Sequence, residues 1–181
     1  MIGDSEWGVL IGELSDRETI GFSYQGDLIA NLGLLAELNW SQPDDQDDHR
    51  FQGVIGFDHR WSNTLHWQLE YYRNGYGSSQ REDYPGLILS TRPVGYLGRD
   101  YTAFAVNYEW TPLLMTNFLW LQNWNDRSGS ATINTLISLS DEAELVFNLG
   151  MPYGSAGSGG SGASEYGLAP NSLFIEYRHY F

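Results

Sequence analysis

The sequence ends with Ser172-Leu-Phe-Ile-Glu-Tyr-Arg-His-Tyr-Phe181, and this stretch decides the class of fold. In an extended strand, successive side chains point to opposite faces, with a period of two residues. One face therefore carries Leu173, Ile175, Tyr177, His179 and Phe181, and the other carries Ser172, Phe174, Glu176, Arg178 and Tyr180. The pattern predicts a final β-strand with aromatic residues at alternate positions.

Segments of about ten residues with a similar alternation fill the rest of the chain. We expect strands near residues 6–15, 18–26, 31–41, 50–61, 64–74, 100–110, 113–124, 130–140, 143–152 and 171–181. The short links between them are 27–30, 62–63, 111–112 and 141–142, and the long links are 42–49, 75–99, 125–129 and 153–170. Ten strands is the preferred count, with eight and twelve as the alternatives.

Short and long links alternate from the second strand onward. This alternation predicts an antiparallel up-and-down arrangement in which, from the second strand onward, the short turns lie at one end and the long loops at the other, with Ser15–Arg17 as a short loop at the long-loop end. It also predicts that both termini lie at the end that carries the short turns. We therefore expect one all-β domain over residues 1–181, closed into a barrel of about ten strands.

The two faces of the expected strands differ in chemistry. In the third strand Leu34, Leu38 and Trp40 oppose Glu37 and Asn39. A soluble up-and-down barrel and a transmembrane barrel share this period of two, so the alternation does not separate them. The bulky aromatic residues on the apolar face, the Gly, Ala and Asn on the other face, and the terminal Phe favour the transmembrane barrel.

The terminal strand resembles the last strand of bacterial outer-membrane β-barrel proteins, which ends in Phe with aromatic residues at alternate positions before it. The resemblance implies a bacterial outer-membrane location and contact with the lipid bilayer. It further implies that Tyr177, His179 and Phe181 form the signal that the barrel assembly machinery recognises.

Four internal motifs resemble the carboxy-terminal part of larger porin-like proteins. They are Tyr96-Leu-Gly-Arg-Asp-Tyr101, Glu109-Trp-Thr-Pro-Leu-Leu114, Asp126-Arg-Ser-Gly-Ser130 and Ser138-Leu-Ser-Asp-Glu-Ala-Glu-Leu145. The resemblance implies a passive channel for small solutes or ions, in a family whose barrels have more strands than the ten expected here. The alternatives are a non-conducting structural or adhesion barrel that acts through its outer loops, and an omptin-like or lipid-modifying enzyme.

The composition limits the kinds of partner that the chain is expected to bind. The chain has 23 Asp and Glu against 9 Lys and Arg, a formal net charge of −14, so nucleic acid is not an expected partner. No run of residues approaches the roughly 18 apolar residues that a transmembrane helix requires. The mean hydropathy of −0.37 suits a barrel, in which only alternate residues meet lipid. The 7 Trp and 12 Tyr suit aromatic belts at the membrane interfaces.

The candidate site consists of polar residues on the polar face of the expected strands. We expect these residues to line a lumen: Glu37, Asp58, Arg60, Glu70, Asn107, Glu109, Glu176 and Arg178. In a narrow isolated barrel these charges would form a salt-bridged plug that stiffens the cylinder. In a wider wall they would form a constriction that selects permeants by charge.

Enzymatic chemistry and cofactors are not expected. The sequence has no phosphate loop, zinc signature or dinucleotide fingerprint, and it has no cysteine. Asp58 and His59 are adjacent and so point to opposite faces, whereas His66 and Glu70 share a face near the end with the short turns. The acidic loop Asp44-Asp45-Gln46-Asp47-Asp48 lacks the Gly and the Glu of an EF-hand, so we expect a solvated loop there, suited to divalent ions that bridge it to anionic outer-leaflet lipids.

Overall fold

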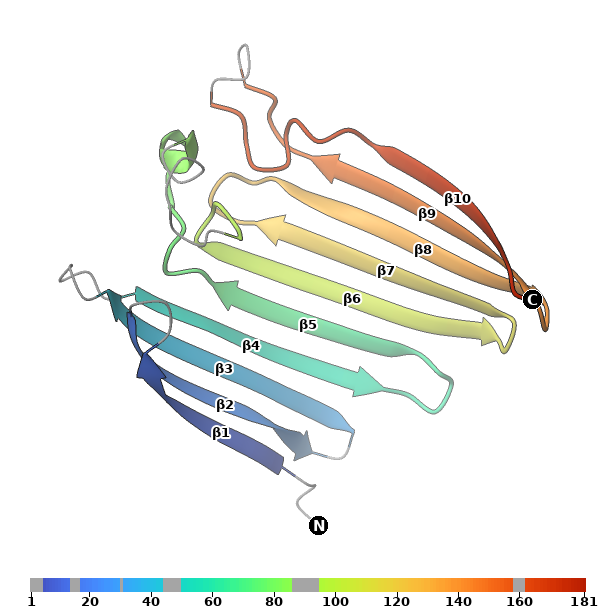
Figure 1. Ribbon diagram of the computed structural model, residues 1–181, viewed down its shortest axis with the longest axis horizontal. Coiled ribbons are helices and arrows are strands. Elements are labelled where there is room, and N and C mark those ends of the chain that lie inside the picture. Colours follow the sequence, from blue (N-terminus) through green and yellow to red (C-terminus); the bar gives the residue numbers. More distant parts are fainter. Residues whose placement is uncertain (1–4, 14–16, 30, 44–49, 86–94, 158–161) are drawn as a thin grey trace.

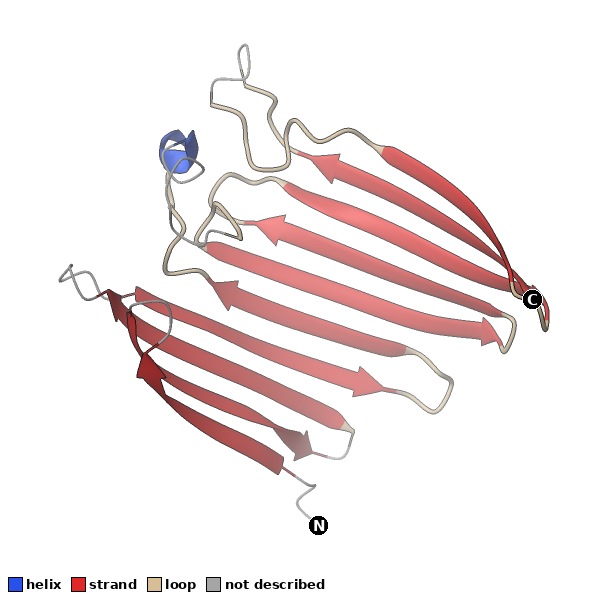
Figure 2. Cartoon of the chain, in the orientation of Figure 1, coloured by secondary structure: helices blue, strands red, loops and turns tan. Residues whose placement is uncertain are grey.

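The computed structural model describes residues 5–13, 17–29, 31–43, 50–85, 95–157 and 162–181. Ten antiparallel strands form one sheet in which each strand pairs with its neighbours along the chain, as Figure 1 shows. The strands are β1 (Ser5–Glu13), β2 (Arg17–Ile29), β3 (Leu32–Pro43), β4 (Arg50–Arg60), β5 (His66–Arg73), β6 (Asp100–Thr111), β7 (Leu114–Asn123), β8 (Gly129–Ser140), β9 (Ala143–Tyr153) and β10 (Ser172–His179). A 3-10 turn, η1 (Arg81–Asp83), lies between β5 and β6 and is the blue element of Figure 2.

The predicted strands are all present. Each observed strand begins and ends within three residues of its predicted bounds, and the order is the expected up-and-down meander. From β2 onward, the short connections gather at one end of the sheet, which we call the turn end, and the longer connections gather at the other, which we call the loop end (Figure 1). β1 begins and β10 finishes at the turn end.

The predicted closure into a barrel is not observed. β1 pairs with β2 and β10 pairs with β9, and the two terminal strands form opposite edges of an open sheet (Figure 1). The pattern of turns and side chains specifies which strands are neighbours. It does not specify the tilt and stagger that set the curvature, and these decide whether ten strands complete a cylinder.

Three β-bulges lie at the turn end, each just before a tight turn. The register shifts between Asp27 and Ile29 in β2, between Glu109 and Thr111 in β6, and between Ser138 and Ser140 in β8. The inserted residues are Leu28, Trp110 and Leu139, all of them exposed. The predicted turn at 27–30 is shorter than expected because β2 continues through its bulge to Ile29.

Very little of the sheet is buried. Among the described residues, the buried hydrophobic side chains are Tyr76, Tyr84, Tyr101, Ala143 and Val146. Three of these five are tyrosines at the loop end, so a layer of packed aliphatic side chains is missing from the described part of the chain. No helix in that part is long and apolar enough to cross a membrane.

Candidate functional site: the polar face of the sheet

The cross-strand register separates the sheet into two faces, because directly opposed residues point to the same side. The apolar face carries, among others, a row that crosses six strands: Trp67, Val106, Phe118, Ile133, Leu149 and Leu173. The opposite side, which we call the polar face, carries a row across β4–β10: Arg60, His66, Asn107, Asn117, Asn134, Asn148 and Phe174. The alternation seen in single strands is thus continuous across the sheet.

Nothing in the described chain covers the apolar face. Leu69, at the centre of the sheet, exposes 40% of its surface, and Ile55 exposes 44%. Towards the edges, Ile11 and Leu173 reach 77% and 70%. Monomeric soluble proteins rarely leave a continuous apolar surface of this extent open to water. The described residues therefore supply no covering for this face.

All seven tryptophans belong to the apolar face. Trp7, Trp40, Trp67, Trp110 and Trp120 lie within strands, on the apolar side of the alternation. Trp61 packs edge-on against the His59 ring of that face, and the Trp124 indole donates a 2.8 Å hydrogen bond to Thr102 Oγ1 on it. Many of these rings lie near one end of the sheet or the other.

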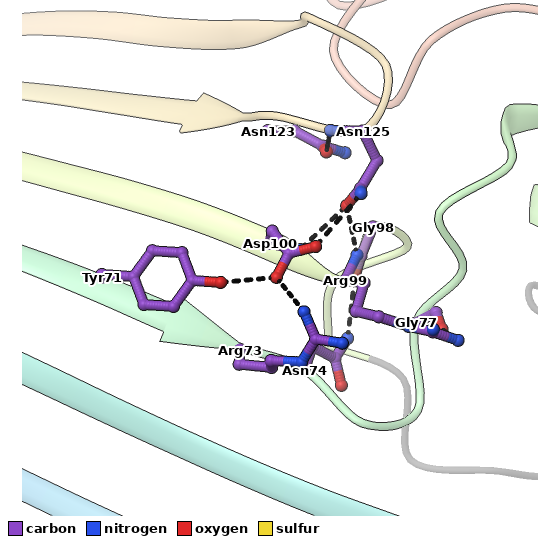
Figure 3. A network of polar contacts seen from close by, with 9 residues as sticks. All are labelled: Tyr71, Arg73, Asn74, Gly77, Gly98, Arg99, Asp100, Asn123 and Asn125. Atoms are coloured by element: carbon purple, nitrogen blue, oxygen red, sulfur yellow. Dashed lines mark hydrogen bonds and ion pairs between the residues drawn. The ribbon is translucent and has the colours of Figure 1, made fainter.

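A polar network borders the apolar face at the loop end (Figure 3). Asp100 Oδ1 accepts hydrogen bonds of 2.6 Å from the Tyr71 hydroxyl and from Arg73 Nη1. Asn125 Oδ1 accepts from the backbone N–H groups of Arg99 (2.6 Å) and Asp100 (2.8 Å), which fixes the loop after β7 to the start of β6. Charged and hydroxyl groups therefore border the apolar face at the loop end.

The residues of the predicted assembly signal lie on the apolar face at the turn end. The Tyr177 and His179 rings are stacked 6.4 Å apart, and the Phe181 ring meets the His179 ring edge-on at 4.8 Å. Both Tyr177 and Phe181 are exposed. The three side chains thus form one accessible aromatic ladder beside the β10 edge.

The structure brings the eight predicted lumen residues onto one face. Glu37, Asp58, Arg60, Glu70, Asn107, Glu109, Glu176 and Arg178 all fall on the polar face by register. They do not form one cluster, because they lie on five strands that span the sheet from β3 to β10. The register adds Glu6, Asp27 and Glu144, so acidic residues outnumber arginines on the described polar face.

The asparagine row was missed by sequence reasoning apart from Asn107. Asn117, Asn134 and Asn148 stand directly beside Asn107 on β7, β8 and β9. All four are half-buried. No local motif marks them, and only the pairing register shows that they are aligned. They place a continuous band of neutral amide groups across the middle of the polar face.

Close polar contacts on this face connect near neighbours. His66 Nε2 lies 3.4 Å from Asp58 Oδ2, whereas Glu70, which shares the face with His66, accepts a 2.7 Å hydrogen bond from Gln68. Arg178 Nη2 donates to Glu176 at 2.9 Å, and Arg178 Nη1 lies 3.9 Å from Glu144. Most of the predicted charges are therefore parts of small local pairs, and they leave space between them.

Hollows open on the polar face, and a small one of about 240 Å³ lies between Glu70, Tyr96 and Tyr101. Two others are wider. One of about 460 Å³ lies along β1–β5 and is lined by Glu37, Asn39, Gln52 and Tyr72, among others. The other, of about 1000 Å³, lies nearer the turn end between Glu6, Asp27, Asp58 and Arg60. The first hollow is lined by apolar side chains such as Leu10 and Val54 as well as by amides and one carboxylate. The second is lined mainly by carboxylates, amides and other polar groups, so it suits water and cations better than an apolar ligand.

The long loops fold over the polar face at the loop end and form a structure that we call the cap, built from residues 74–85, 95–99, 124–128 and 162–167. Tyr101, which exposes 2% of its surface, donates a 2.6 Å hydrogen bond to Glu165 and accepts one of 2.5 Å from the Gly98 N–H. Asn123, fully buried, donates from Nδ2 to the Tyr84 hydroxyl (3.1 Å) and to Glu165 (2.9 Å). Glu165 therefore joins three segments that are distant in the sequence.

Further contacts make the cap compact. The Asn74 side-chain amide donates to the backbone carbonyls of Tyr96 (2.8 Å) and Gly98 (3.1 Å). Its Oδ1 accepts a hydrogen bond from the Tyr76 N–H. A Cβ added at Gly77 would lie 1.8 Å from the Gly98 carbonyl oxygen, so this approach requires glycine. Burial raises the pKa of Tyr84 to about 12, which keeps its hydroxyl neutral. The described parts of the 75–99 loop thus cap the sheet at its loop end.

Replacing Asn123 with Ala is expected to loosen the cap without unpairing the strands. The change leaves the half-buried Glu165 carboxylate and the buried Tyr84 hydroxyl each short of one donor, at a cost of about 1–3 kcal/mol. Protease cleavage within residues 162–171 should become faster. Asn117→Ala, at a half-buried position on the same strand with no cap contact, is the matched control. Equal cleavage rates in both variants would contradict the role given to Asn123.

Comparison with family models, with curated proteins and with solved structures gave no match. The described residues contain no group of three or more His, Cys, Asp or Glu side chains arranged to hold a metal ion. The acidic stretch Asp44–Asp48, considered above for Ca²⁺, lies outside the described residues.

Proposed function

We propose that this chain forms a section of the wall of a porin-like passive channel in the bacterial outer membrane. Its apolar face would contact lipid and its polar face would line a water-filled lumen. The observation that carries the proposal is the separation of the two faces: the uncovered side holds every tryptophan, and the loops pack over the polar side. A soluble sheet would instead pack its elements against the apolar side.

The dimensions of the sheet support a membrane span. On β4, Phe51 lies near the loop end and Trp61 follows the strand at the turn end. Ten residues of strand rise about 33 Å. At a tilt of about 45°, this corresponds to roughly 23 Å along the membrane normal, close to the apolar band of about 25 Å that outer-membrane barrels present to lipid. Aromatic side chains at both ends match the two interfacial belts.

The chemistry of the polar face supports passage of cations and small polar solutes. Carboxylates exceed arginines there, and carboxylates that line a pore attract cations. The asparagine row offers donors and acceptors without charge. The ladder of Tyr177, His179 and Phe181 would serve as the assembly signal for the barrel assembly machinery. Anionic outer-leaflet lipids would surround the loop end.

A non-conducting structural or adhesion barrel is a second candidate, and the cap is the observation that favours it. A loop structure fixed by buried hydrogen bonds is suited to presenting a surface outside the cell. Single-channel recording in planar bilayers separates the two candidates, because only the channel gives discrete current steps.

Leu69→Arg is expected to destabilise the membrane-inserted protein by about 2–4 kcal/mol, because it places a guanidinium in hydrocarbon near mid-membrane. Gln68→Arg is the matched control: it is the adjacent residue, points to the polar face and lies beside Asp58 and Glu70. Urea titration of both variants in lipid vesicles measures the difference. Equal stabilities would contradict the assigned orientation of the faces.

Glu70→Gln and Glu109→Gln are expected to lower the cation preference of the channel, because each removes a carboxylate from the polar face. Reversal potentials in asymmetric salt give the selectivity of each variant. Glu142→Gln changes an exposed carboxylate in the turn between β8 and β9 and serves as the control. Unchanged selectivity in both Glu70→Gln and Glu109→Gln would exclude these residues from the permeation pathway.

A further inference from the structure

A small pocket on the polar face, beside the cap, is walled by tyrosine rings. It is the hollow of about 240 Å³, and we call it the tyrosine pocket. Drug-sized ligands occupy cavities of about 300–1000 Å³, so this pocket has the size for a smaller molecule. Its lining includes Val54, Glu70, Tyr72, Tyr96, Tyr101 and Leu121.

The three tyrosine rings come from two parts of the structure. Tyr72 and Tyr101 are directly opposed on β5 and β6, and Tyr96 belongs to the cap. The Tyr96 centroid lies 4.9 Å from that of Tyr101 and 6.1 Å from that of Tyr72, and the Tyr72 and Tyr101 centroids are 6.4 Å apart. The rings are tilted to one another by 33–61° and are not stacked. A cation between them can lie within about 6 Å of all three centroids, the range of cation–π attraction.

Hydrogen bonds hold two of these rings in place. The Tyr101 hydroxyl donates to Glu165 and accepts from the Gly98 N–H, and the Tyr72 hydroxyl accepts a 2.9 Å hydrogen bond from Gln52 Nε2. Both hydroxyl groups are therefore engaged outside the pocket, and the rings offer it their aromatic surfaces. Walls that are fixed before a ligand arrives lower the cost of binding it.

Glu70 gives the tyrosine pocket its charge. It is the charged member of the described lining, and Gln68 donates a 2.7 Å hydrogen bond to its Oε1. Among the described residues, no hydrogen-bond donor contacts the second oxygen, Oε2. Gly56 and Ala103 flank Glu70 on the neighbouring strands, and such small residues leave room beside the carboxylate. A positive charge is therefore attracted to this position and an anion is repelled.

We propose that the tyrosine pocket binds a small organic cation with a quaternary ammonium group. Such a cation presents methyl groups to Val54 and Leu121, and its charge to the rings and to Glu70. A primary ammonium has three N–H donors that need acceptors, and the described lining offers a carboxylate only at Glu70. A neutral apolar ligand would take water from the Glu70 carboxylate without replacing it.

The same site would set the class of permeant, because the tyrosine pocket lies on the face that we propose lines the lumen. This part of the inference rests on the proposed function, whereas binding itself does not. Organic cations would pause at the tyrosine pocket during passage.

Binding of choline to the full-length chain tests the site. The protein is folded in micelles of dodecyl maltoside, which contain no choline, and saturation-transfer NMR follows the choline methyl signal as its concentration rises. The control ligand is the neutral alcohol in which a tert-butyl group replaces the trimethylammonium group, and both ligands are also titrated into protein-free micelles. We expect choline to bind about threefold to thirtyfold more tightly than the alcohol. Equal affinities, or no saturable binding of choline, would overturn the proposal.

Two variants assign the binding to the tyrosine pocket. Tyr96→Leu keeps an apolar side chain but removes a ring, and the hydrogen bond that Tyr96 makes to Asn74 uses its backbone carbonyl. It should weaken choline binding about threefold to thirtyfold and leave the alcohol nearly unaffected. Glu70→Gln should act in the same direction. Tyr108→Leu, which removes a tyrosine from the apolar face, is the matched control. Unchanged choline affinity in both Tyr96→Leu and Glu70→Gln would overturn the site.

Channel recording separates this inference from the proposed function. In planar bilayers of phosphatidylethanolamine and phosphatidylglycerol, choline should reduce the potassium current in a saturable way, and less so in Tyr96→Leu. Choline binding in micelles without current steps in bilayers would contradict the channel and leave the site in place. Current steps without choline binding would overturn the site and leave the channel in place.

Discussion

Side chains alternate between the two faces of a β-strand, and in this protein that constraint is obeyed in register across ten strands. Apolar groups gather on one side of the sheet and polar groups on the other. Because no second layer covers the apolar side in the described chain, the sheet has no interior of the usual kind. The position of the tryptophans on the apolar side and the packing of the loops over the polar side both follow this division of the sheet into two faces.

The cap contains buried side chains, of which the sheet has very few. Its central groups are polar or amphipathic: Tyr101 and Asn123 are buried, Glu165 is half-buried, and the three are joined by hydrogen bonds. Buried hydrogen-bond networks of this kind fix one conformation because leaving any member unpaired is costly. The loop end is therefore expected to keep its shape, whereas the sheet below it has little buried surface of its own to hold its curvature. A rigid cap over the polar face also narrows one end of the space that this face borders.

The sequence predicted the strands well because the signal for them is local. A period of two and turn-forming residues are visible in each segment, and the observed bounds agree with them. The grouping of Glu37, Asp58 and the other candidate residues on one face could also be predicted, because alternate residues of a strand point to the same face.

The features that could not be predicted depend on how neighbouring strands pair, and the sequence of a single strand does not show this. The bulges at Leu28, Trp110 and Leu139, the alignment of the asparagines and the contacts of Glu165 all require the cross-strand register. Closure requires the curvature of the whole sheet, and there the expectation of a complete ten-stranded barrel was wrong.

Tryptophan fluorescence tests the central claim most directly, because all seven indoles lie on the apolar face. In vesicles whose lipids carry bromine on their acyl chains, strong quenching relative to vesicles of unbrominated lipid is the predicted result, with weak quenching by aqueous acrylamide. If brominated lipids leave the emission unchanged and acrylamide quenches it as fully as it quenches the unfolded chain, the apolar face does not meet lipid and the account fails.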